Sequence, residues 1–211
     1  MLKNLRLKTQ LGLGFAAVVA LFLATLVCIA QRVAHLEAGI RYLSDDDLPM
    51  LLAVDRMDLS RSEVQQFLTD VAATHDPAAF AEADAAAKDY AEASQQVRAV
   101  LSREQDQTQL KALDRMDADF KAFHDSGRTM AEAYISDGIE AGNRLMKGSA
   151  GQPGFDQASE QIASQIEAFR ETQLARTRRS VEDDLAQVLH IERTMLVGGA
   201  LATLVATVFA V

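Results

Sequence analysis

The sequence predicts an all-α protein, an antiparallel up-down-up-down four-helix bundle that is continuous with two transmembrane helices. Three observations lead to this prediction. Two long apolar segments flank a polar middle, the apolar residues of that middle recur with helical spacing, and the chain contains no alternating run of β-branched residues. The elements are justified below in chain order.

The formal net charge of −9 is distributed very unevenly along the 211 residues. Residues 1–31 contain three bases and no acid, and residues 195–211 contain no charge at all. All 30 acids therefore lie in residues 32–194 with the other 18 bases, which gives this stretch a net charge of −12. Such an acidic domain lacks the basic surface that nucleic-acid binding requires. The single cysteine, Cys28, excludes an internal disulfide.

Residues 1–10 are predicted to be a cytoplasmic leader and residues 11–31 the first transmembrane helix. Leu11–Ala30 is almost wholly apolar, and twenty residues at 1.5 Å rise cover the roughly 30 Å hydrocarbon core of a bilayer. A cleaved signal peptide is the alternative, but its apolar core is normally about 7–15 residues. Lys3, Arg6 and Lys8 keep the N-terminus in the cytoplasm by the positive-inside rule, so residues 32–194 are exported.

Residues 195–211 are predicted to form the second transmembrane helix, which returns toward the cytoplasm. This segment is apolar for 17 residues, a length that just suffices to span. Either it is a complete short span or the chain is cut within it. Gly198 and Gly199 would permit close approach of another helix.

The first helix of the bundle is predicted over residues 32–75 from a heptad seam. Ten of the twelve seam positions are apolar, as in a coiled coil: Val33, Leu36, Ile40, Leu43, Asp47, Met50, Val54, Met57, Arg61, Val64, Leu68 and Val71. Pro49 lies inside this helix and removes a backbone donor, so we expect a kink near Asp45–Pro49.

Three further helices are predicted from turn signals and apolar spacing. Asp76 as N-cap and Pro77 at the first helical position start the second, which runs to about Ser102. The third covers roughly 105–146, and the glycine-rich stretch 148–154 is a loop. The fourth begins at about Phe155 and continues into the second span. Four helices with short connections predict the up-down-up-down bundle.

A search for catalytic and metal-binding patterns gives no candidate. Di-iron bundles use Glu-x-x-His pairs, and no histidine here follows a glutamate at that spacing. His75 beside Asp76 and His124 within a helix are more simply read as ordinary polar residues than as ligands of a metal or a haem. No triad, Walker or Rossmann pattern is present. We therefore expect no enzyme activity, no metal and no cofactor.

Arg61 is the residue that most requires an explanation, because it occupies a seam position where an apolar residue belongs. Burial of an unpaired guanidinium is very unfavourable, so Arg61 must face water, an acid or an anionic ligand. Gln65 lies one turn further on and shares its face. Arg56 lies about 140° around the helix from Arg61. One helix could not easily aim both arginines at one small ligand, whereas two copies related by a two-fold axis could. The alternative is a wet dimer seam, or an ion pair with an acid of the bundle.

At these residues the sequence resembles a known family. The leader, the span, the exported bundle and the returning span resemble the input half of methyl-accepting chemotaxis receptors. The string from Arg56 to Val64 is similar to the ligand-binding stretch of the enterobacterial aspartate receptor's first helix. That family uses arginines at the places of Arg56 and Arg61 to hold ligand carboxylates at the dimer interface. Its third arginine falls on Gln65 here. The family's fourth-helix end of the pocket matches Gln152-Pro153, and Gly154 replaces the expected hydroxyl residue.

The resemblance implies a chemoreceptor input module in a bacterial inner membrane, with residues 32–194 periplasmic or extracellular. The expected ligand is a small amino or organic acid, held by Arg56, Arg61, Gln65 and Gln152 in a homodimer. A kinase and an adaptor would be reached only through a cytoplasmic part that this chain does not contain. Two alternatives remain open: the same module serving a histidine kinase or cyclase, and a non-sensory membrane-anchored scaffold.

Overall fold

The structure is a computed structural model that describes residues 7–149 and 151–210. Lys3 and Arg6 of the expected leader lie outside the described residues. The described chain is almost entirely α-helical, which confirms the all-α class. It divides into two compact units: Ser44–Arg176, and a second unit made of the residues up to Leu43 and from Thr177 onward. The two units are described separately.

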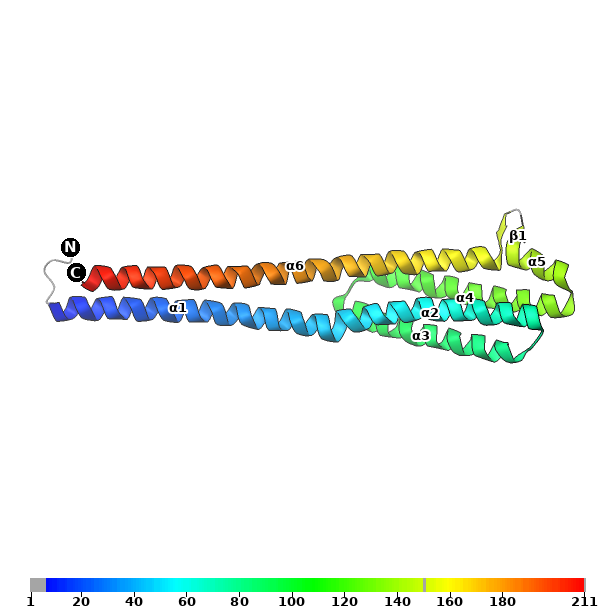
Figure 1. The fold of residues 1–211 in the computed structure, drawn as a ribbon, viewed down its shortest axis with the longest axis horizontal. Helices are drawn as coiled ribbons and strands as arrows, with labels where there is room; N and C mark the ends of the chain where they lie inside the picture. The colour runs from blue at the N-terminus through cyan, green and yellow to red at the C-terminus, as the bar shows by residue number, and fades with distance from the viewer. Residues whose placement is uncertain (1–6, 150, 211) are drawn as a thin grey trace. The chain divides into compact units, whose positions relative to one another are not determined.

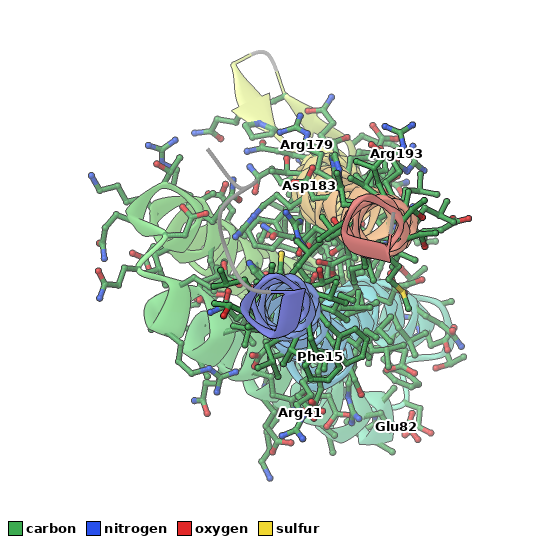
Figure 2. The ribbon with its side chains drawn as sticks, turned by 90° about the vertical axis from the view of Figure 1, so that its left-hand side faces the viewer. Phe15, Arg41, Glu82, Arg179, Asp183 and Arg193 are labelled. Carbon is green, nitrogen blue, oxygen red and sulfur yellow. The ribbon has the colours of Figure 1, made fainter. Side chains whose placement is uncertain are left out.

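The second unit contains α1 (Leu7–Tyr42) and the C-terminal half of α6 (Phe155–Ala210), which lie side by side in Figure 1. Both helices are long and apolar enough to span a membrane, as judged by length and composition. Their large apolar side chains are exposed rather than buried. Phe15, which projects from α1 in Figure 2, is 74% exposed, and Leu196 of α6 is 67% exposed.

Small residues set the approach of these two helices. A Cβ atom added to Gly198 would lie 2.8 Å from Oγ1 of Thr25 on α1, so the helices meet closely there. Gly199 has no atom within 4 Å of such a Cβ and faces open space. Of the two glycines expected to permit close approach, Gly198 is therefore the one in contact.

The unit Ser44–Arg176 is built from α2 (Leu48–Thr74), α3 (Ala78–Glu104), α4 (Gln107–Ser136), α5 (Ile139–Lys147) and the start of α6. A two-stranded antiparallel hairpin of β1 (Gly148–Ser149) and β2 (Gln152–Pro153) stands where a loop was predicted. A π-helical turn, Leu43–Asp47, comes directly before α2. This irregularity falls at the position where the kink was expected, next to Pro49.

The core of this unit lies between α2, α3, α4 and α6. The seam predicted along α2 is buried on one face, and it includes Met50, Val54, Met57, Val64, Leu68 and Val71. The facing helices contribute Ala83, Tyr90, Val97 and Leu101 from α3, Leu113, Met116, Phe120 and Phe123 from α4, and Phe155, Ile162, Ile166 and Phe169 from α6. A chain of aromatic contacts links three of these helices, from Tyr90 through Phe120 and Phe123 to Phe155.

The helix boundaries agree with the prediction except within 105–146, where one helix was expected and α4 and α5 are found. The break lies at Gly138, whose φ of 86° is a conformation that side-chain-bearing residues rarely adopt. The prediction of one continuous helix was wrong here, because the Asp137-Gly138 turn signal was not recognised. The start of α6 at Phe155 and the end of α2 at Thr74 are confirmed.

Gly127 provides a test of core packing. A Cβ atom there would lie 2.4 Å from the Phe155 ring and 2.6 Å from a methyl carbon of Leu68. Phe155 is buried and stacked on Phe123, so it cannot move aside easily. We expect Gly127→Ala to lower the free energy of unfolding by about 1–3 kcal/mol in urea denaturation of the full chain in detergent. Gly199→Ala, which meets no atom, is the control. Equal stability of the two variants would contradict this packing.

Tyr90 provides a second test, because its buried hydroxyl has no hydrogen-bond partner among the described residues. Burial, and then the carboxylates of Asp117 and Asp119, raise the pKa of this hydroxyl, which therefore stays neutral. We expect Tyr90→Phe to be neutral or stabilising by up to about 1 kcal/mol. Tyr134→Phe loses a 2.6 Å hydrogen bond to Asn143 and should lower stability by about 1 kcal/mol. A large loss for Tyr90→Phe would show that a water molecule satisfies the hydroxyl.

Candidate functional site

Arg61 lies in a cluster of polar side chains between α2 and α6. Its side chain is only 13% exposed, and its guanidinium has three partners. Nε donates to Oδ1 of Asp58 at 2.9 Å, and Nη1 donates to Oγ of Ser159 at 2.9 Å and to Oε1 of Gln65 at 3.4 Å. Arg61 is therefore paired within one protomer. This agrees with the alternative considered above, an ion pair between Arg61 and an acid of the bundle.

Ser159 completes this cluster, and sequence reasoning missed it. Its hydroxyl accepts from Arg61 and donates to Oε1 of Gln65 at 2.8 Å, so the oxygen is used in both directions although the residue is 2% exposed. Ser159 shares the buried face of α6 with Phe155, Ile162 and Ile166. A polar residue on that apolar face, opposite the polar break in the α2 seam, was the signal that could have identified it. We call Arg61, Gln65 and Ser159 the Arg61 cluster.

Arg56 does not belong to the Arg61 cluster. Its Nη2 atom donates to Oδ2 of Asp89 on α3 at 2.9 Å, and both side chains are largely exposed. An exposed pair of this kind stabilises the fold by about 0–1 kcal/mol. Within one protomer the two arginines thus point to different neighbouring helices, as their spacing on α2 predicted.

Gln152 also lies apart from the Arg61 cluster. It is exposed in β2, where it pairs with Ser149 across the hairpin. Among the described residues no contact joins it to Arg61 or Gln65. The structure therefore brings together two of the four predicted ligand-binding residues, Arg61 and Gln65.

Arg61 also lines a groove of about 460 Å³ between α2 and α6. A second guanidinium, that of Arg170, lines the same groove, and no pattern in the sequence marked this residue. Arg170 donates to Glu167 at 2.9 Å and lies 4.0 Å from Asp55. The hydrogen bond that Arg170 donates to Glu167 raises the pKa of Arg170 and lowers the pKa of the Glu167 carboxyl.

The charges of this groove decide what it can bind. Three carboxylates, Asp55, Asp58 and Glu167, line it together with the two arginines. Both guanidinium groups therefore already have carboxylate partners, and an incoming carboxylate must replace one of them. Selectivity for an anion would come from the geometry of the arginines rather than from an excess of positive charge.

The described residues contain no group of three or more His, Cys, Asp or Glu side chains that could hold a metal ion. His124 lies 3.0 Å from Oδ1 of Asp84, which Arg128 also contacts at 2.9 Å. His75 Nε2 lies 3.3 Å from the carbonyl oxygen of Tyr134. These distances place His124 of α4 next to α3, and His75 next to α4.

Comparisons of the chain with protein-family models, with curated proteins and with solved structures found no match.

Gln65 is the residue on which the Arg61 cluster depends, since its Oε1 accepts from both Arg61 and Ser159. Gln65→Ala removes this acceptor and leaves a buried hydroxyl with one partner fewer. We expect the free energy of unfolding to fall by about 1–2 kcal/mol in urea denaturation.

Gln66 is the matched control for this prediction, because it is the next residue of the same helix and is exposed. Gln66→Ala should change stability by less than about 0.5 kcal/mol. Equal effects at the two positions would mean that the cluster contributes no stability.

Proposed function

We propose that this chain is the input module of a transmembrane chemoreceptor, which senses a small carboxylate at the interface of a homodimer. The observation that carries the proposal is an uncovered row of leucines on α2 beside the groove that holds Arg61. Leu48, Leu52 and Leu59 are 50%, 68% and 58% exposed, although the opposite face of the same helix is fully buried.

The leucine row has the spacing of an interhelical contact. Leu48, Leu52 and Leu59 follow one another at intervals of four and seven residues, which places them on one face of α2. Exposed apolar side chains in such a row mark an interaction surface more often than a solvent-facing one. A second copy of α2 packed across a two-fold axis would cover them. Leu59 itself lines the groove with Arg61, so the ligand would bind next to that axis.

The proposed dimer also gives Arg56 a role. Its pair with Asp89 is exposed and weak, so the guanidinium can turn toward another partner at little cost. In the proposed dimer, Arg56 of one protomer and Arg61 of the other approach the same ligand carboxylates. A planar guanidinium can hold a carboxylate through two parallel hydrogen bonds.

The membrane part of the proposal rests on α1 and the C-terminal half of α6. Their apolar side chains are exposed along both helices. Contact of this apolar surface with water is unfavourable, and a hydrocarbon environment would remove that free-energy cost. The acid-free segment 1–31, with its three bases near the N-terminus, supports a cytoplasmic N-terminus in a bacterial inner membrane. Residues 32–194 would then be a periplasmic or extracellular four-helix bundle.

Transmission would run through α6, which is one helix from Phe155 to Ala210. The Arg61 cluster holds α6 through Ser159, so a ligand that competes for Arg61 acts directly on this helix. Binding can shift an equilibrium between two helix positions only by its differential affinity for them. A displacement of about one to two ångströms is the usual size of such helix shifts.

Disulfide formation tests the dimer. In a Cys28→Ser background, Leu59→Cys should form a cross-linked dimer in membranes under mild oxidation, because a two-fold axis brings equivalent residues together. Ala85→Cys, an exposed position on α3, is the control and should remain monomeric. If Leu59→Cys cross-links no faster than Ala85→Cys, α2 does not form the interface and the non-sensory scaffold becomes the better explanation.

Calorimetry tests the ligand. The full chain in lipid nanodiscs is titrated with amino and organic acids, and Arg61→Ala should weaken at least one hit about tenfold or more, equivalent to about 1.4 kcal/mol. Arg144→Ala, which removes an exposed arginine of α5, should leave the affinity unchanged. If Arg61→Ala binds every hit as well as the parent does, the site is misplaced. Sensory modules of kinases and cyclases would share these properties.

A further inference from the structure

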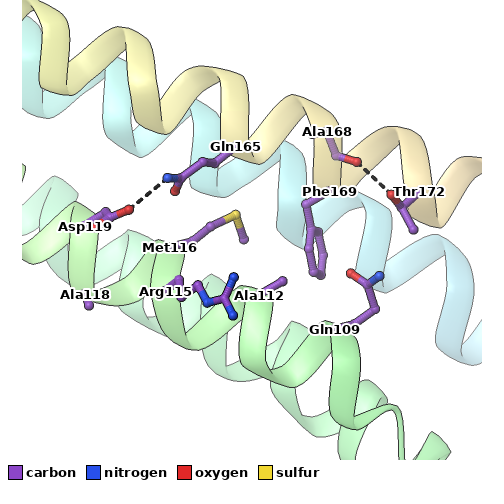
Figure 3. A pocket seen from close by; sticks show the side chains of 10 residues that line it. All are labelled: Gln109, Ala112, Arg115, Met116, Ala118, Asp119, Gln165, Ala168, Phe169 and Thr172. Carbon is purple, nitrogen blue, oxygen red and sulfur yellow. Dashed lines mark hydrogen bonds between the residues drawn. The ribbon is translucent and has the colours of Figure 1, made fainter.

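A second groove lies between α4 and α6, on a different face of α6 from the Arg61 cluster. Its volume is about 530 Å³, within the range of about 300–1,000 Å³ that small-molecule sites occupy. Figure 3 shows the side chains that line it, with polar groups at its edges and apolar groups between them.

One part of this groove offers two hydrogen-bond acceptors. Gln165 Nε2 donates to Oδ2 of Asp119 at 2.8 Å, and this contact fixes the orientation of the amide, because a carboxylate needs a donor. The amide oxygen Oε1 of Gln165 is enclosed and has no hydrogen-bond partner among the described residues. A carboxylate and an unpaired carbonyl oxygen side by side can both accept hydrogen bonds from the N–H donors of one ligand.

Arg115 provides the opposite charge. It lies one helical turn before Asp119 on α4, it is exposed, and Figure 3 shows its guanidinium next to Ala112 on the α4 side of the groove. Arg61 and Arg170 have carboxylate partners, whereas Arg115 has no ion pair in the part of the chain that the structure describes. An unpaired guanidinium that lines a groove can bind a carboxylate.

The wall between these charged groups is apolar. Met116 and Phe169 are 3% and 4% exposed, and Ala112 and Ala168 lie beside them. A hydrocarbon group of the size of a short aliphatic side chain can contact this wall and remove apolar surface from water.

We propose that this groove binds a small zwitterion with a carboxylate, a protonated amine and a short apolar group. The carboxylate is held by Arg115, the ammonium lies between Asp119 and Oε1 of Gln165, and the apolar group packs on Met116 and Phe169. Asp119 disfavours a simple anion, and Arg115 disfavours a simple cation. The site needs neither a membrane nor a second copy of the chain, so it is independent of the function proposed above.

Three probes of nearly identical shape test this assignment by calorimetry on the full chain in nanodiscs. L-leucine has all three groups, 4-methylpentanoate lacks the ammonium, and 3-methylbutylamine lacks the carboxylate. We expect leucine to bind about tenfold more tightly than either analogue, because each analogue loses one set of charge-assisted hydrogen bonds. The assignment is overturned if leucine does not bind, or binds no better than the analogues, since the groove then holds only water.

Variants locate the bound probe. Arg115→Gln should weaken leucine about tenfold and remove its advantage over 3-methylbutylamine, and Asp119→Asn should remove its advantage over 4-methylpentanoate. Arg144→Gln is the matched control and should bind leucine like the parent. If leucine binding is lost in Arg61→Ala but retained in Arg115→Gln, leucine occupies the interface site and this proposal fails. If both the Arg115 and Asp119 variants bind like the parent, it fails as well. Circular dichroism confirms that each variant is folded.

Discussion

The burial of one apolar seam on α2 is the constraint on which the unit Ser44–Arg176 depends. From Met50 to Val71 this seam lies against α3, α4 and α6, and the aromatic chain from Tyr90 to Phe155 fills the space between those three helices. Arg61 interrupts the seam, and this largely buried guanidinium is tolerated because Asp58, Ser159 and Gln65 all accept hydrogen bonds from it. The polar break is therefore matched across the interface rather than left open to water.

The acidic composition of the unit controls its electrostatics at short range. Most arginines that line grooves are held by nearby carboxylates, as Arg61 is by Asp58 and Arg170 is by Glu167. A ligand carboxylate in the α2–α6 groove must therefore replace a carboxylate that already pairs with the arginine. The net gain in binding free energy is smaller than for an arginine that has no partner. Arg115 differs, because the carboxylate in its groove, that of Asp119, accepts a hydrogen bond from the Gln165 amide and does not pair with Arg115.

The features that could be predicted from the sequence are those that depend on residues close together in the chain. The α2 seam, the end of α2 at Thr74 and the start of α6 at Phe155 follow from apolar spacing and from Asp, Pro and Gly signals. The partners of a side chain on another helix could not be predicted in this way. Ser159 is recognisable as a polar residue on the apolar face of α6, but no spacing within either helix specifies that Ser159 and Arg170 lie near Arg61. The break at Gly138 was readable from Asp137-Gly138 but was outweighed by helical spacing on both sides.

Tyr134 joins three parts of the chain near the Gly138 break. Its carbonyl oxygen lies beside the His75 ring after α2, its hydroxyl binds Asn143, and its ring lies against Gly142 of α5. His75 has a φ of 60°, a conformation that is costly for residues other than glycine, so this contact helps to offset local strain. The nine-residue α5 has one fully buried residue, Gly142, and Tyr134 of α4 contacts both Gly142 and the Met146 sulfur. Local opening of α5 and release of His75 should therefore occur as one cooperative event, visible as a shared rate of amide hydrogen exchange.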